Sequence, residues 1–164
     1  MKKDRLRESA VLAVGSARGE MTGIKPAEFS AECRVGRLVE ARLCWVNDAA
    51  DVRRFREQMR LAFEVAGDSV ICADWRRAVV LPPNAGDALL ELLRQGNRHF
   101  KRSAVLLAPD NAVFGLQVER LCREAGNPAR RTFRDVAPVL AWLQEILTPL
   151  ESARAAEFLS HGSW

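Results

Sequence analysis

The chain has 164 residues, of which 48% are hydrophobic and 28% charged, so it can form one globular domain with a buried core and is not disordered throughout. Its net charge of +4 is too small for the dense positive field of a dedicated nucleic-acid binder. No apolar run approaches the roughly 20 residues that a membrane span needs, which predicts a soluble protein.

The N-terminal segment, residues 1–26, is polar and is interpreted as a leader. It is expected to be either disordered or to contribute one edge strand at 10–14. A signal peptide is the alternative, and Asp4 and Glu8 argue against it because such a segment lacks acidic residues.

The next segment predicts a β-hairpin. Its strands are expected at 29–34 and 37–46, and a Val35-Gly36 turn joins them. In the second strand, apolar and polar side chains mix in the way that suits a strand buried on one face.

Helices and short apolar strands alternate after the hairpin. Asp48, Asn84 and Asp135 are placed to cap three of the helices, with Asp87 in the first turn of the second helix, and the 109–111 turn caps the remaining one. The apolar stripes of the helices span 52–66, 85–93, 114–125 and 139–150, and strands are expected at 69–73, 103–108 and 129–133.

This alternation predicts an α/β domain over residues 27–150. Strands that alternate with helices imply a mostly parallel sheet with right-handed crossovers. We expect four or five strands, an N-terminal hairpin and about four helices. Pro149 is interpreted as the end of the domain, and 151–164 as a C-terminal tail that adds at most a frayed helical turn.

Five segments within residues 28–150 also follow the order of a known family. They are ICADW at a strand end, the helix NAGDALLELL, the strand SAVLLA, the helix FGLQVERLCREAG, and RRTFRDVAPVLAWLQEIL, with Phe133, Asp135 and Ala141-Trp142-Leu143 as its short motif. In these segments the chain resembles the STAS domain, and more closely its bacterial anti-sigma factor antagonist-like branch.

The resemblance implies a regulatory, signalling protein that binds a partner and catalyses no reaction. In the regulated members, a Ser at the start of the second helix is phosphorylated, where the helix dipole and free N–H groups favour the phosphate. The matching stretch here, 82–87, contains neither Ser nor Thr. The resemblance therefore implies either that this switch has been lost or that binding is constitutive or regulated differently.

Three aspartates form the best candidate for a reactive or metal site. Asp74 and Asp110 each follow an apolar strand, and with Asp135 they could form a metal or phospho-acceptor cluster. Roles as helix caps and as a turn former explain these three aspartates better.

The motifs of common enzymes are missing from the sequence. The chain has no G-x-S-x-G and no nucleotide-binding glycine motif, and His99 lies in a basic turn. No enzymatic activity, catalytic residue or cofactor is expected.

The four cysteines, Cys33, Cys44, Cys72 and Cys122, form no C-x-x-C pair, and three of them fall in apolar segments. Buried free thiols in a reducing compartment are the simplest account, which predicts a cytoplasmic protein. The spacing of zinc ligands is absent, so no metal is expected.

The carboxyl edge of the sheet is therefore interpreted as a docking surface for another regulatory protein. Trp75 is either an exposed interface anchor or a loop residue packed on the sheet. A small-ligand or lipid-binding domain that uses the crevice at this edge is the alternative, and a deep apolar pocket would favour it. A homodimer stays open, and the basic segments 53–56, 98–102 and 130–131 form a solvated face or a rim rather than a nucleic-acid site. The expected partner-binding residues are Asp74, Trp75, Asn84, Asp87, Asp110 and Asn111.

Overall fold

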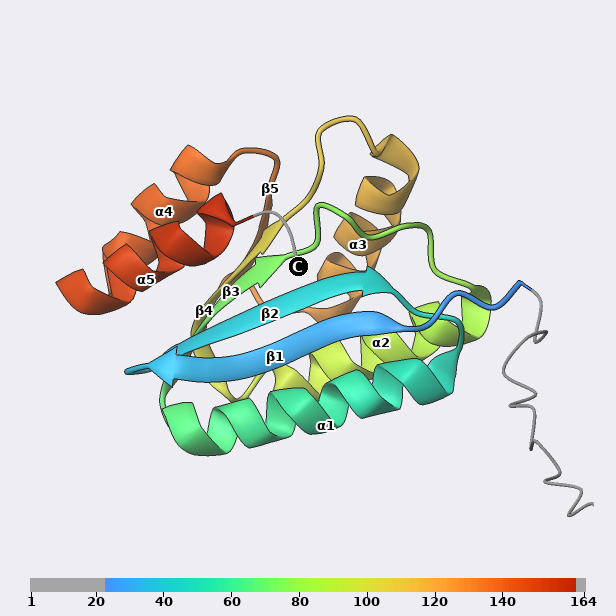
Figure 1. The fold of residues 1–164 in the computed structure, drawn as a ribbon, viewed down its shortest axis with the longest axis horizontal. Coiled ribbons are helices and arrows are strands. Elements are labelled where there is room, and N and C mark those ends of the chain that lie inside the picture. Colours follow the sequence, from blue (N-terminus) through green and yellow to red (C-terminus); the bar gives the residue numbers. More distant parts are fainter. Residues whose placement is uncertain (1–22, 162–164) are drawn as a thin grey trace, which may run out of the picture.

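The computed structural model describes residues 23–161 and is drawn in Figure 1. The expected edge strand at 10–14 and the possible signal peptide lie outside the described residues. Within 23–161 the chain forms one α/β domain, as predicted, and its first strand begins at Glu28.

The centre of the fold is a five-stranded mixed sheet in the order β1-β2-β3-β4-β5. The predicted hairpin is present, because β1 (Glu28–Val35) and β2 (Leu38–Trp45) pair antiparallel. The remaining strands, β3 (Ser69–Asp74), β4 (Phe100–Leu106) and β5 (Arg130–Phe133), continue from β2 in parallel. The carboxyl ends of β2 to β5 therefore share one edge.

Helices cover both faces of this sheet. α1 (Ala49–Ala66), α2 (Pro83–Gly96) and α3 (Ala112–Ala125) pack on one face, because each parallel strand is added beside the previous one by a right-handed crossover. α4 (Val136–Gln144) and α5 (Pro149–Ser160) pack on the other face, where Figure 1 draws them in orange and red. None of the helices between residues 23 and 161 is long and apolar enough to cross a membrane.

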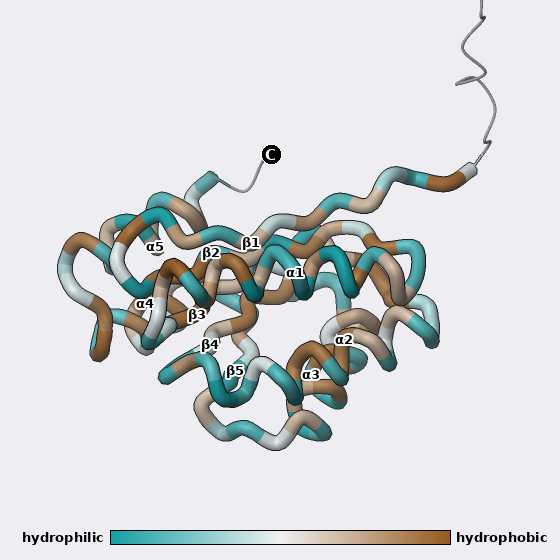
Figure 2. Tube along the Cα trace, turned by 90° about the horizontal axis from the view of Figure 1, so that it is seen from below, coloured by the Kyte–Doolittle hydropathy of each residue, from teal (hydrophilic) through white to brown (hydrophobic). Residues whose placement is uncertain are grey.

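The core is divided by the sheet into two layers. On β2, Val39 and Ala41 point toward α1–α3, whereas Leu38 points toward α4 and α5, as alternation along a strand requires. The larger layer lies between the sheet and α1–α3. Figure 2 shows hydrophobic stretches of α2 and α3 next to each other in this layer.

The helix starts agree only in part with the predicted caps. Asp48 caps α1 by accepting the Asp51 N–H, and Asn111 caps α3 by accepting the Phe114 N–H. Asp135 occupies the N-cap position of α4 but makes no capping hydrogen bond.

The predicted helix is present as α2, but its predicted N-terminal cap was wrong. The helix begins at Pro83, with Pro82 at the N-cap, because the φ of proline is already suited to the first helical position. Asn84 is therefore inside the helix, and Asp87 lies beyond its first turn.

The C-terminal prediction was also wrong. The expected helix ending at Leu150 stops at Gln144, and residues that were interpreted as a tail form the 12-residue helix α5. Thr148 and Glu151 make a reciprocal capping box at its start. Pro149 is the first residue of this helix, where a missing N–H has no cost, so it begins a helix instead of ending the domain.

Candidate functional site

Asp74, the last residue of β3, does not lie on an open surface. Its side chain is buried and forms a two-point ion pair with Arg76, in which Nε–Oδ1 is 2.9 Å and Nη2–Oδ2 is 2.7 Å. Arg76 also donates to the Leu159 carbonyl at the end of α5, at 2.8 Å. Asp74 thus ties the sheet edge to α5, and it is not available to a docked partner.

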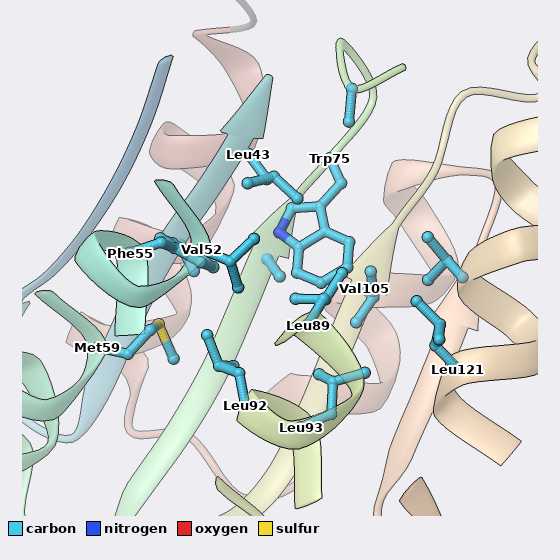
Figure 3. Packing of buried hydrophobic residues seen from close by; sticks show 14 of the residues in the cluster. Leu43, Val52, Phe55, Met59, Trp75, Leu89, Leu92, Leu93, Val105 and Leu121 are labelled. Atoms are coloured by element: carbon cyan, nitrogen blue, oxygen red, sulfur yellow. The ribbon is translucent and has the colours of Figure 1, made fainter. Parts of the chain in front are cut away.

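Trp75 is packed in the core, so the expectation of an exposed anchor was wrong and the packed alternative is confirmed. Only 3% of its surface is exposed, and its backbone N–H extends the ladder by donating to the Leu106 carbonyl at 2.9 Å. Figure 3 shows its ring between Leu43 and Leu89, with the nitrogen on the edge that faces α1. The indole N–H has no acceptor among the described residues, which costs about 1–3 kcal/mol for a buried donor.

The loop from Trp75 to Pro82 is fixed on α3. The Asn111 side-chain amide donates to the Ala78 carbonyl at 2.9 Å. Gln117 makes two bonds to Leu81, accepting its N–H at 2.8 Å and donating to its carbonyl at 3.1 Å. Asn111 therefore has a structural role, because it both caps α3 and holds the loop.

The fixed loop presents an exposed apolar surface together with α3. Val79 and Val80 come from the loop, and Val113 and Leu116 from the first turns of α3, with exposed fractions between 37% and 66%. We call these four residues the valine–leucine patch. Sequence reasoning missed it, because exposure of an apolar side chain in a loop depends on which neighbours the fold brings near.

Three of the expected partner-binding residues are exposed near this patch. Asn84 and Asp87 lie on the first half of α2, and Asp110 lies in the turn before α3. The loop before α2 follows β3, and the turn before α3 follows β4. Because these two strands are parallel, the three residues share the carboxyl edge of the sheet with the patch. Sequence reasoning therefore chose the correct edge and identified its polar rim. It did not identify the apolar residues of the valine–leucine patch.

A cavity of about 580 Å³ lies elsewhere, between α1, α2 and the sheet. Its inner wall is apolar and includes Phe55, Met59, Ile71 and Leu92, and Trp75 also lines it. Figure 3 shows Met59 and Leu92 projecting from the two helices toward each other. This volume lies within the range of about 300–1,000 Å³ for small-molecule pockets, although it is not at the expected crevice.

The titratable side chains of the edge do not converge. Asp74 is paired with Arg76, while Asp110 and Asp135 are exposed, and no group of three His, Cys, Asp or Glu side chains within residues 23–161 could hold a metal ion. Burial raises the pKa of Cys72, and it raises the pKa of Cys122 to about 11. Both thiols are therefore protonated at neutral pH, which disfavours thiolate chemistry there.

Comparisons with known proteins assign no family to this chain. No protein-family model matches the chain, and no curated protein matches it. The fold is an α/β fold in which an N-terminal β-hairpin is followed by alternating strands and helices.

Proposed function

We propose that the protein is a non-enzymatic regulatory module of STAS type that binds another protein through the valine–leucine patch. The observation that carries this proposal is the exposure of four apolar side chains on one fixed surface at the carboxyl edge of the sheet. A cluster of exposed apolar side chains rimmed by polar residues is typical of a protein-interaction site.

The rigidity of the loop favours binding. Hydrogen bonds from Asn111 and Gln117 hold both ends of the Val79-Val80 segment, so little backbone freedom is lost when a partner docks. Association loses less free energy to ordering when the surface is already formed.

The charges beside the patch indicate the chemistry of the partner. Asp87 and Asp110 are exposed at the same edge, while the nearby Arg77 is paired with Glu28 at 3.4 Å, so a partner with an apolar centre and basic residues around it is complementary. The start of α2 offers no hydroxyl for phosphorylation, because residues 82–87 lack Ser and Thr. Binding at this surface is therefore constitutive or is controlled from another site.

Paired surface substitutions test this proposal. We expect Val80→Asp with Leu116→Asp to abolish capture of a partner that the unchanged protein retains, since charge replaces two exposed apolar anchors. Leu150→Asp is the matched control, because Leu150 is just as exposed but lies on α5, across the sheet. Circular dichroism should show that both variants are folded.

The proposal fails if the double variant keeps every partner, or if Leu150→Asp loses the same ones. Light scattering of the purified protein tests whether the patch instead mediates self-association. A dimer that the double variant converts to monomer would mean that the patch binds a second copy of this chain instead of another regulatory protein.

A further inference from the structure

The cavity between α1 and α2 is long, and its lining changes character from the inside to the opening. The α1 residues that line it run from Phe55 to Glu64, a helical rise of about 14 Å. Its buried lining is almost entirely apolar, whereas the exposed residues at its opening are all polar. Those exposed residues are Arg56, Glu57, Arg60, Glu64, Gln95, Arg98 and His99.

The charges at the opening are only partly balanced. Arg60 is bound by both glutamates there, Glu57 and Glu64. Arg56 and Arg98 have no carboxylate within 4.0 Å in the part of the chain that the structure describes. Arg56 donates a hydrogen bond to Gln95 at 3.4 Å, and Arg98 donates one to His99 at 3.4 Å. Hydrogen bonds from Arg60 and, more weakly, the charge of Arg56 lower the pKa of Glu57. Neither Arg56 nor Arg98 forms an ion pair within residues 23–161, so both guanidinium groups can bind an anion at the opening.

A third arginine adds positive charge in the wall of the cavity. Arg130 is 8% exposed, and its guanidinium donates to the Asn97 side-chain oxygen at 2.9 Å and to the Leu93 carbonyl at 3.1 Å. No carboxylate pairs with it among residues 23–161, so this buried charge is met by two neutral oxygens and by the face of the Phe100 ring, whose centroid lies 4.9 Å from the guanidinium carbon. Such a site disfavours a cationic ligand and favours an anionic one.

We propose that this cavity binds a single-chain amphiphile with a carboxylate head group, such as a fatty acid. The head group binds Arg56 and Arg98 at the opening, where guanidinium and carboxylate form charge-assisted hydrogen bonds. The apolar chain lies against Phe55, Met59 and Leu92. This site is independent of docking at the valine–leucine patch.

Titration of the full chain with dodecanoate, below its micelle concentration, tests the proposal. We expect saturable binding at one site by calorimetry, with dodecylamine at least about tenfold weaker because its cationic head group meets Arg56 and Arg98. Changing both arginines to Gln should weaken dodecanoate at least about tenfold. Arg53→Gln with Arg94→Gln is the matched control, since these arginines are exposed on α1 and α2 but do not line the cavity.

The methyl resonance of Met59 locates the bound chain. Dodecanoate should shift this resonance in a protein labelled at its methionine methyl groups. The proposal is overturned if Met59 does not shift, if dodecylamine binds as tightly as dodecanoate, or if the Arg53/Arg94 control weakens binding as much as the Arg56/Arg98 variant.

Discussion

Arg154 on α5 binds both carboxylate oxygens of Glu40 on β2, although 114 residues separate the two in the chain. The Nη2–Oε2 distance is 2.7 Å, and Glu40 is only 2% exposed. The hydrogen bonds and the charge of Glu40 raise the pKa of the Arg154 guanidinium. A buried charge therefore depends on a helix that lies at the far end of the described chain.

Removal of this arginine should destabilise the protein strongly. Arg154→Met leaves the Glu40 carboxylate buried and unpaired, and we expect the free energy of unfolding to fall by about 3–5 kcal/mol. Urea denaturation at neutral pH measures it. Glu157→Gln removes the exposed second partner of Arg154 and should cost less than about 1 kcal/mol. Equal losses in the two variants would contradict a special role for the buried pair.

Trp75 should behave as a core residue. Trp75→Ala removes a buried ring, and we expect a loss of about 3–5 kcal/mol in the free energy of unfolding. Trp75→Phe keeps an aromatic ring and eliminates the N–H that lacks an acceptor, so it should cost clearly less than Trp75→Ala. Denaturant unfolding compares the two, and a stable Trp75→Ala variant would show that the ring is not part of the core.

Two carboxyl groups should make the protein less stable in acid. Burial alone would raise the pKa of Glu151, but hydrogen bonds from the Arg37 and Thr148 N–H groups outweigh it and lower that pKa. The pKa of Asp51 is lowered in the same way by Asn47 and Arg54. Because both folded pKa values lie below the unfolded ones, the stabilisation is present above about pH 4–5 and is lost as the pH falls through the folded values.

Urea unfolding at a series of pH values checks this dependence. Glu151→Gln cannot titrate, so its unfolding free energy should fall less steeply between about pH 5 and pH 3 than that of the unchanged protein. An identical slope in both proteins would mean that Glu151 does not contribute to the acid sensitivity.

Gly36, in the β1–β2 turn, should tolerate a side chain less well than other glycines with a positive φ. Its φ is +54°, and a Cβ atom there would collide with the Glu151 carboxylate. Gly126 also has a positive φ, +77°, but nothing lies within 4 Å of its Cβ position. We expect Gly126→Ala to cost about 1–2 kcal/mol for the backbone alone. Gly36→Ala should cost more in thermal unfolding, and an equal cost would argue against the close approach of α5.

The strand–helix order was predictable because it depends on local patterns. The helical spacing from Val52 to Ala66 and the apolar run 70–73 within β3 each indicate one element without reference to the rest of the chain. The start of α5 was also present in the sequence, since Thr148, Pro149 and Glu151 form the pattern of a capping box. It was missed because Pro149 was interpreted as a stop.

The surface could not be predicted in the same way. Whether Trp75 is buried depends on Leu43 and Leu89, which approach it only in the folded sheet. The exposure of Val79 and Val80 depends on Gln117, which holds the loop from 36 positions away. The basic opening of the cavity likewise combines Arg56 of α1 with Arg98 of the turn after α2, which are distant in sequence.

The two layers of the core should assemble at different times. α1, α2 and α3 each pack beside strands that are their neighbours in the chain, so this layer can form while synthesis proceeds. The opposite layer needs α5, which must return to β2 across most of the domain. Until α5 has packed, the nascent chain exposes Leu38, Val70 and Cys72. We expect this partly folded intermediate to be the species that engages chaperones or aggregates.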